Sequence, residues 1–363
     1  MEQSNGAAGR LSLVHPIIQA PMAGGADTPA LVAAVSEAGG IGFIGAAYLS
    51  PAQILEAARA VRERTSRPFG INLFAPQPAP QARGIERAIR RVAPYYEELG
   101  LPPPAPPAVR SLPFDEQIAA CIESGAAAFS FTFGVPPPDT IAAVKSAGLF
   151  VLGTATSVEE AVLLEKAGVD AVVAQGVEAG GHRGTFVGDF GSAMIGTMAL
   201  VPQVADAVRV PVVASGGIMD GRGIAAAVAL GASAVQMGTA FLTSDEAGIP
   251  EAYKQQIVGA TERDTRVTTA FSGRPARGIV NRFMTEVDAG AHADEILPFP
   301  LQNALTRPLR TEAAKRGRAE FLSLWAGQGA RMARRMPAAR LVAALAEEIE
   351  ATFRRVAGAR PLS

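Results

Sequence analysis

Eight short apolar runs, separated mainly by alanine-rich segments of helical period, restrict the possible folds of this chain more than any other feature. The alternation of strand and helix is typical of a parallel sheet covered by its crossover helices. Most of the runs are apolar throughout, as expected for strands that are buried on both faces. The predicted strands are residues 16–20, 42–46, 69–74, 127–133, 149–154, 171–175, 211–215 and 234–239.

Eight such units close most economically into a (β/α)8 barrel, the TIM-barrel form of the α/β class, which commonly runs to about 250 residues. A doubly wound open sheet is the competing architecture. Its dinucleotide-binding form carries Gly-x-Gly-x-x-Gly after the first strand, whereas the first strand here leads into APMAGGAD at residues 20–27. We therefore predict the barrel.

Two segments depart from the repeat and define the predicted domain organisation. Residues 75–113 are proline-rich around a charged helical piece, and the alternation resumes beyond them, so we interpret them as an insertion after strand 3 of a barrel that spans residues 1–260. Residues 261–363 should form a polar irregular stretch, a proline-marked lid turn at 297–302 and C-terminal helices. In the last helix a four-residue recurrence predicts an apolar stripe against the barrel: Leu341, Leu345, Ile349 and Phe353.

Charge and composition exclude several classes of partner. A net charge of -1 gives no basis for binding nucleic acid or an acidic membrane surface. The single cysteine, Cys121, rules out an internal disulfide, and neither a signal peptide nor a membrane-spanning run is evident. We expect a cytoplasmic protein without membrane or nucleic-acid partners, and a homodimer is one possible assembly.

The ends of the seventh and eighth predicted strands indicate an anion site. Ser215-Gly216-Gly217 and Gln236-Met237-Gly238-Thr239 form two adjacent glycine turns, at the habitual phosphate position of barrel enzymes. Their backbone N–H groups can converge on a phosphate, with support from the dipole of a helix that starts near residue 221. The alternative is that these glycines only make tight turns.

Amide side chains at other strand ends extend this prediction to a heterocycle. Asn72 and Gln175 could contact the donor–acceptor edge of a flavin, with Ala20, Pro21 and Met22 lining the ring. Together with the phosphate turns they suggest flavin mononucleotide (FMN). Either amide could instead be a core residue whose hydrogen bonds are all made to neighbouring strands. A dinucleotide is less favoured because no ribose-binding acid is evident.

His182 lies in the glycine-rich loop after the sixth predicted strand, AVVAQGVEAGGHRGTF at residues 171–186. Glycines 180, 181 and 184 would permit positive φ and a close approach to a bound ring. The imidazole would then face the open side of the cofactor, with a pKa suited to proton abstraction near neutrality. The alternative is a solvent-exposed loop histidine.

Other reactive side chains are less suitable for catalysis. His15 precedes the first strand, at the opposite end of a barrel, and His292 lies in a polar segment. No cluster has the spacing of a metal site, so we predict no metal. Cys121 is expected to be a small buried residue. Glu178 could orient or neutralise a neighbour, but a solvated loop carboxylate is the favoured interpretation. The absence of Gly-x-Ser-x-Gly disfavours a serine hydrolase.

These same motifs resemble the nitronate monooxygenases, formerly called 2-nitropropane dioxygenases, over nearly the whole chain. The similar stretches are residues 16–25, 131–136, 174–186, 211–242, 305–310 and 324–329. FTFGVP at 131–136 and RGTF at 183–186 point to the class I branch that oxidises nitronates.

The resemblance implies a barrel that binds FMN non-covalently and uses His182 as the catalytic base. It implies oxidation by O2 of alkyl nitronates, including propionate 3-nitronate, and of nitroalkanes, to a carbonyl compound and nitrite. With the strand-end residues above, the predicted FMN-binding set is Ala20, Pro21, Met22, Asn72, Gln175, Gly180, Gly181, Ser215, Gly216, Gly217, Gln236, Met237, Gly238 and Thr239.

The proline turn departs from the family pattern. Phe299 and Asn303 stand where some members carry tyrosines, and Arg307 stands where a lysine can occur. This leaves substrate preference open, with Arg307 or Arg183 as candidate partners of an anionic nitronate. Two rival functions also stay open: an NAD(P)H-dependent flavin reductase of the enoyl-acyl-carrier-protein or quinone reductase type, and a non-catalytic flavin-binding barrel.

Overall fold

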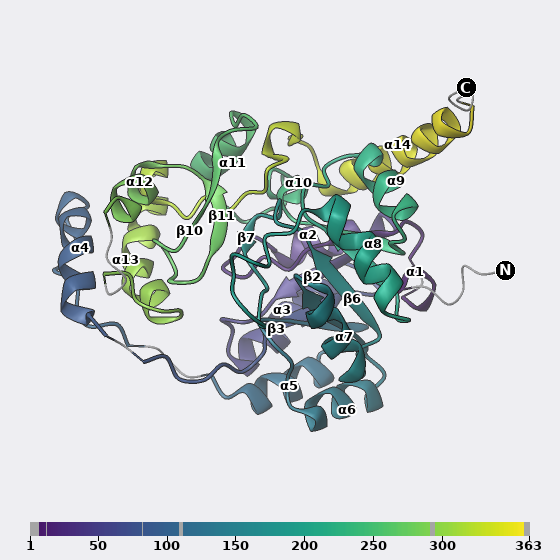
Figure 1. The fold of residues 1–363 in the computed structure, drawn as a ribbon, viewed down its shortest axis with the longest axis horizontal. Coiled ribbons are helices and arrows are strands. Elements are labelled where there is room, and N and C mark those ends of the chain that lie inside the picture. Colours follow the sequence, from purple (N-terminus) through teal and green to yellow (C-terminus); the bar gives the residue numbers. More distant parts are fainter. Residues whose placement is uncertain (1–6, 12, 82, 109–111, 291–294, 359–363) are drawn as a thin grey trace.

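The protein is a closed barrel of eight parallel strands in the order β1-β2-β3-β4-β5-β6-β8-β9 (Figure 1). This computed structural model describes residues 7–11, 13–81, 83–108, 112–290 and 295–358. Each predicted run coincides with one strand to within two residues, so the barrel prediction is confirmed. The strands are β1 (Ile17–Gln19), β2 (Ile41–Gly45), β3 (Gly70–Phe74), β4 (Ala128–Thr132), β5 (Phe150–Ala155), β6 (Ala171–Gln175), β8 (Val212–Ser215) and β9 (Ala234–Met237).

The barrel helices begin where the sequence provides caps. Ser50 and Gln53 form a capping box at the start of α3, and the hydroxyl of Ser157 accepts a hydrogen bond from the first turn of α7. Glycines of positive φ, such as Gly148 and Gly168, follow the helix ends. The helices are α1 (Ala7–Arg10), α2 (Pro29–Glu37), α3 (Pro51–Arg62), α5 (Phe114–Glu123), α6 (Pro138–Ser146), α7 (Val158–Lys166), α8 (Thr197–Ala207), α9 (Gly221–Ala229) and α10 (Thr239–Leu242).

The last helix, α14 (Ala338–Gly358), packs on the barrel through most of its predicted stripe. Leu341, Leu345 and Ile349 are buried in the same apolar core as the strands and barrel helices. Phe353 is 43% exposed, so its predicted burial is wrong. Figure 1 shows the reason: the final turns of α14 extend past α9, where they have no barrel surface to cover.

The insertion after β3 carries one helix, α4 (Ile85–Glu98), between extended proline-rich connections. Instead of covering the barrel, α4 lies outside α12 and α13, far from the strands it connects (Figure 1). The hydroxyl of Tyr96 on α4 donates to the carbonyl of Leu305 at 2.6 Å. The insertion therefore shares a second apolar core with three helices of the C-terminal half, α11 (Glu251–Val258), α12 (Arg282–Asp288) and α13 (Leu301–Arg316).

A small antiparallel sheet replaces the polar irregular stretch expected after residue 260. Strands β10 (Thr265–Thr268) and β11 (Ala276–Ile279) form a hairpin, and β11 also pairs with β7 (Gly181–His182). In that pairing Ala276 lies opposite His182. The expectation of irregular structure is wrong because hydrogen bonds to distant β7 help to order the segment. A separate domain boundary at residue 260 stays a prediction.

No helix within the described residues is long and apolar enough to cross a membrane.

Candidate active site

A cavity of about 680 Å³ lies at the C-terminal ends of the barrel strands. Such volumes are typical of sites for cofactors and small substrates. The structure brings every predicted site residue to the wall of this cavity, although the residues come from six separate parts of the chain. They are Ala20, Pro21, Met22, Asn72, Gln175, Gly180, Gly181, His182, Ser215, Gly216, Gly217, Gln236, Met237, Gly238 and Thr239.

The turn after β8 is built from two glycines in conformations that other residues rarely adopt. Gly216 and Gly217 both adopt positive φ, at 114° and 71°. A Cβ on Gly217 would lie only 3.2 Å from the Cβ of Glu178, so a larger residue would be crowded as well as strained. The N–H groups of Gly217 and Ile218 donate no hydrogen bond to any described residue, so they are free to bind a ligand.

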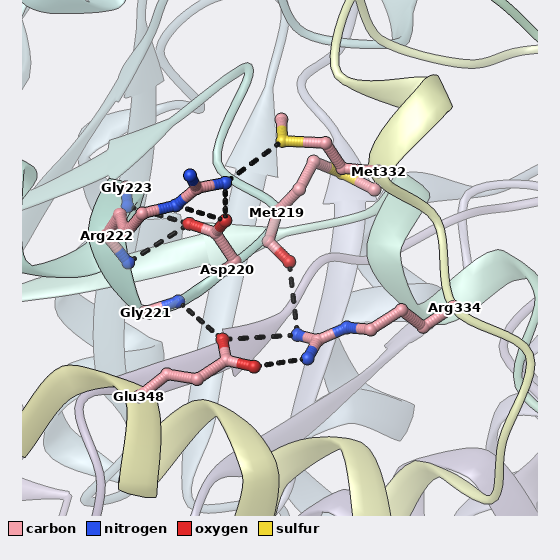
Figure 2. Close-up of polar contacts among 8 residues, drawn as sticks. All are labelled: Met219, Asp220, Gly221, Arg222, Gly223, Met332, Arg334 and Glu348. Carbon is pink, nitrogen blue, oxygen red and sulfur yellow. Dashed lines mark hydrogen bonds and ion pairs between the residues drawn. The ribbon is translucent and has the colours of Figure 1, made fainter. Parts of the chain in front are cut away.

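The expected support from helix α9 is wrong, because carboxylates already occupy its N-terminus (Figure 2). Asp220 accepts hydrogen bonds from the N–H groups of Arg222 at 3.0 Å and Gly223 at 3.1 Å. Glu348 of α14 accepts from the N–H of Gly221 at 2.9 Å. These two negative charges offset the positive end of the helix dipole. Among the groups at this end of the barrel, the glycine turns and the start of the short helix α10 keep N–H groups that these carboxylates do not occupy.

Arg334 also links α14 to the turn after β8. We call its contacts with Glu348 and Met219, together with the contact between Glu348 and Gly221, the brace. The guanidinium of Arg334 forms an ion pair with Glu348 and donates to the carbonyl of Met219 at 3.5 Å (Figure 2). Met219 follows the glycine turn by two residues and lines the cavity. The C-terminal helix thus supports the glycine turn after β8 from outside.

The three amide side chains of the site differ in how far the protein satisfies them. Gln175 accepts from the N–H of Gly184 at 2.8 Å and donates to the carbonyl of His182 at 3.1 Å. Asn72 donates to the hydroxyl of Ser130 at 2.8 Å across β3 and β4. Gln236 makes no side-chain hydrogen bond within the described part of the chain and is free for a ligand.

Arg183 is a structural residue, neither a substrate ligand nor a solvated side chain. It is 1% exposed and is absent from the cavity wall. Its guanidinium donates to the carbonyls of Gln175 at 2.9 Å, Gly176 at 2.7 Å and Ala193 at 3.0 Å. Burial lowers its pKa to about 10. It holds the end of β6 and orients the amide of Gln175.

Two predicted roles in the histidine loop need correction. Only Gly181, of the three glycines expected at positive φ, adopts it, at 73°. Gly180 is required for another reason: a Cβ there would lie 2.6 Å from the backbone of Ala326 and Gly327. Glu178 is not a solvated carboxylate, because it accepts from the backbone N–H of Thr197 at 2.9 Å and its hydroxyl at 2.8 Å. It thereby caps helix α8.

His182 is a partly buried base held in place on β7. Its Nε2 lies 2.9 Å from the hydroxyl of Ser272 in the β10–β11 turn. Burial, and then the positive charges of Arg274 and Arg310, lower its pKa to about 3. The prediction of a pKa near neutrality is therefore wrong for the cavity as described. The ring is neutral at physiological pH, the form in which imidazole accepts a proton.

Aromatic rings surround His182. Phe133, Phe299 and Trp325 have ring centroids 5.9, 5.8 and 5.6 Å from the imidazole. Phe133, in the FTFGVP motif, is strained at a φ of 77°, and the guanidinium of Arg274 lies 3.9 Å above its ring. The rings restrict the space around the imidazole and reduce its access to water.

Helix α13 adds a cationic wall to the cavity. Asn303 and Arg307 line it, as the family comparison of the proline turn suggested, and Arg310 lies there too. Arg310 donates to the side chain of Asn303 at 2.7 Å, while its Nε is buried without a partner among the described atoms. Burial lowers the pKa of Arg310 to about 10, which leaves it charged at neutral pH.

Sequence reasoning missed several residues of this site. Ser272, Trp325 and Arg310 come from segments outside the strand ends, where the barrel rule gives no signal. Tyr48 lies three residues after β2, where that rule does apply, and was overlooked. LWAGQG at 324–329, already noted as similar to the family, could have drawn attention to Trp325.

The other reactive side chains lie away from the cavity. His15 precedes β1 at the opposite end of the barrel, and His292 lies outside the described residues. Cys121 is fully buried on α5, and burial raises its pKa to about 12. Within the described ranges, no group of three or more His, Cys, Asp or Glu side chains could hold a metal ion.

Comparisons with known proteins agree with this geometry. The nitronate monooxygenase family model matches residues 7–348. A probable nitronate monooxygenase of Staphylococcus saprophyticus is 45% identical over 347 residues, covering 94% of this chain and 96% of that protein. One of Staphylococcus aureus is 44% identical over 341 residues, covering 93% and 95%.

Solved structures extend the comparison to the fold. A nitroalkane oxidase from Streptomyces ansochromogenes is 44% identical with a TM-score of 0.89, and covers 95% of this chain and 98% of its own. FabK from Thermotoga maritima is 32% identical with a TM-score of 0.75, and 97% of each chain is covered. The barrel, its strand-end cavity and these relatives together show that this chain belongs to the nitronate monooxygenase family of oxidoreductases.

Proposed function

We propose that this protein binds FMN in the strand-end cavity and oxidises alkyl nitronates, with O2 as oxidant, to carbonyl compounds and nitrite. Propionate 3-nitronate represents the expected substrate class, and neutral nitroalkanes would be substrates after His182 removes their α-proton. The observation that carries the proposal is the position of His182 on the wall of the same cavity as the glycine turns.

The hydrogen-bond donors on the cavity wall are of the kinds that the phosphate and the ring edge of FMN require. The free N–H groups of Gly217 and Ile218, with the start of α10, would hold the phosphate. Gln236 has an amide free for the ring edge, and Met22 would line the ring. Flavin, when bound, supplies the electron-accepting group that the side chains of this cavity lack.

The protein's own groups would then handle the proton and the charge. Neutral His182 would take the α-proton of a nitroalkane, and the C–H electron pair would pass into the nitro group to form a nitronate. The imidazolium produced, together with Arg310, would stabilise that anion. Phe133, Phe299 and Trp325 would limit the access of water to these charges.

The direct test is a spectrum of the purified protein, release of its flavin by denaturation, and a nitrite assay with propionate 3-nitronate. We expect a yellow protein that releases FMN, and nitrite formation that consumes O2. Release of a different flavin would overturn the cofactor proposal, and the absence of nitrite would overturn the activity.

An NAD(P)H-dependent flavin reductase, of the enoyl-acyl-carrier-protein or quinone reductase type, is the second candidate. It is favoured by one observation: the cavity continues to Arg307, Arg310 and Lys315, whose charges could bind the phosphates of a nicotinamide dinucleotide. Anaerobic mixing separates the two functions. Rapid bleaching of the flavin by NADPH, with no bleaching by a nitronate, would favour the reductase.

We infer small-molecule substrates, a cytoplasmic location and a homodimer as one possible assembly. If wild type and His182→Asn behaved alike on every oxidisable substrate, the alternative of a non-catalytic flavin-binding role would gain support.

A further inference from the structure

Ser272 is the only described side chain that makes a hydrogen bond to the imidazole of His182. Its hydroxyl oxygen lies 2.9 Å from Nε2, and the residue is 1% exposed. Ser272 is ninety residues away in sequence, in the turn between β10 and β11, and reaches His182 because β11 pairs with β7. The contact thus exists only in the folded chain.

The surroundings of the Ser272 hydroxyl favour one direction for this hydrogen bond. Its oxygen lies 3.1 Å from the carbonyl oxygen of Arg274 and 3.3 Å from the backbone nitrogen of Arg274. A carbonyl can only accept, and no other described group donates to that one. Since a hydroxyl has one hydrogen, donation to the carbonyl leaves its oxygen to accept from both the Arg274 N–H and Nε2.

We propose that Ser272 is a positioning residue that holds His182 in the tautomer protonated at Nε2, so that the lone pair of Nδ1 serves as the catalytic base. Neutral imidazole carries one N–H and one lone pair, and the hydrogen bond at one nitrogen sets the state of the other. In the proposed reaction the substrate C–H bond breaks, its proton goes to Nδ1, and its electron pair enters the nitro group. This inference rests on the function proposed above.

The protein also restricts rotation of the ring, which would exchange the two nitrogens. The backbone N–H of Arg183 donates to the carbonyl of Pro275 at 2.9 Å and ties β7 to the turn that carries Ser272. The rings of Phe133, Phe299 and Trp325 flank the imidazole on other sides. Nε2 therefore stays toward Ser272 through the proton transfer, and its hydrogen bond gains strength once the imidazole is charged.

The first test reads the tautomer without any substrate. The chain has three histidines, so 15N-histidine labelling of the flavin-loaded protein gives few signals, and His182→Asn identifies those of His182. We expect the Nε2-protonated tautomer in wild type and a mixture of tautomers in Ser272→Ala. An Nδ1-protonated His182 in wild type, or an unchanged spectrum in Ser272→Ala, would overturn the proposal even if the protein oxidised no nitro compound.

The second test uses the difference between a neutral nitroalkane and its preformed nitronate, since only the nitroalkane must lose a proton. Ser272→Ala should lower kcat/KM for the nitroalkane about tenfold, the effect of one lost hydrogen bond of ordinary strength. The value for the nitronate should change less than about twofold, and Ser272→Thr, which keeps the hydroxyl, should recover part of the loss.

A matched control separates positioning from packing. Ser244 is also fully buried, lies outside the cavity wall, and its hydroxyl has no partner among the described atoms. Ser244→Ala should leave both the substrate ratio and the tautomer unchanged. Equal losses on both substrates in Ser272→Ala would show a purely structural role and contradict the proposal.

Discussion

The two walls of the cavity are built on different principles. On the barrel side, strand ends and glycine turns present backbone N–H groups and amides, and the positions repeat with the βα period. On the lid side, α13 and the segment around Trp325 present cations and an aromatic ring, and Ser272 lies behind this wall, where its hydroxyl contacts His182. The barrel side thus offers hydrogen-bonding groups, whereas the lid side offers positive charge and aromatic surface.

His182 belongs to both walls. Its loop follows β6 of the barrel, and its strand, β7, pairs with β11 in the three-stranded sheet β10-β11-β7. Backbone pairing to β11 positions it more firmly than a free glycine loop would. We therefore expect changes on the barrel side to alter FMN affinity and changes on the lid side to alter the KM for the substrate. Only changes at His182 should abolish proton transfer.

The largest expected effect is that of His182→Asn. It should lower kcat/KM for neutral nitroalkanes by about 10² to 10⁴, the range of general base catalysis, while FMN stays bound. Nitrite release from a nitroalkane and from its preformed nitronate measures the difference. His15→Asn, at the other end of the barrel, is the control. Equal losses on both substrates would show that His182 does not act as a base.

The lowered pKa of His182 should make the stability of the protein depend on pH. Its pKa is lowered from 6.5 to about 3, so the unfolded chain takes up a proton at a pH where the folded flavin-free protein does not. The associated stability is present above pH 6.5 and is lost as the pH falls from 6.5 toward 3. Denaturant unfolding at several pH values should show a smaller acid loss in His182→Gln than in wild type. Parallel losses would contradict the lowered pKa.

Gly217→Ala tests the barrel side alone. Alanine at a φ of 71° is strained, and its Cβ would crowd Glu178, so the turn should shift and FMN affinity should fall about tenfold or more. Gly168→Ala is the matched control, because it has a φ of 90°, open space around its Cβ and no place in the cavity wall. Flavin titration of both variants measures the effect. Similar FMN affinities would remove Gly217 from the phosphate site.

Arg310→Gln tests the lid side alone. The KM for an anionic nitronate should rise about threefold to tenfold, since one charge near a partly buried anion is worth on the order of 1 kcal/mol. FMN affinity and the KM for a neutral nitroalkane should change much less. Arg316→Gln, in an exposed ion pair with Glu312 at the end of α13, provides the comparison. A matching rise for the neutral substrate would show that Arg310 only supports the fold.

The smallest effect is expected at the brace behind the glycine turn. Glu348→Gln weakens a partly exposed ion pair with Arg334 and should lower the free energy of unfolding by about 0.5–1 kcal/mol. FMN affinity should stay within about twofold. A tenfold loss of FMN would instead mean that α14 sets the geometry of the phosphate turn.

The sequence predicted the barrel side well, because the βα period places every strand end at one face. Gly216, Gly217 and Gly238 could be placed in the cavity from position alone, and the structure brings them there. Sequence reasoning did less well where a distant contact decides the local state. The α9 N-terminus looked free for a ligand, yet Glu348, more than a hundred residues later, occupies it.

Two further predictions, one for an apolar residue and one for a charged residue, failed because the surroundings of each side chain were not known. Phe353 continues the stripe of Leu341 and Leu345, but the barrel surface ends before the helix does. Arg183 follows His182 and was a candidate substrate ligand, whereas its charge is directed into backbone carbonyls. In both cases the residue type indicated a kind of contact, apolar packing or charge pairing, but the sequence did not show which groups surround the side chain.

By itself the sequence determined the closed barrel, the face that carries the cavity and the loop that carries His182, because these follow from short-range periodicity and glycine turns. The tertiary structure alone decided what surrounds that histidine: Ser272 at Nε2, the aromatic rings, the two arginines and a pKa far below neutrality. The physical reason is that hydrogen bonds and burial depend on distances in space. Here those distances are set by β11 pairing with β7 across ninety residues of chain.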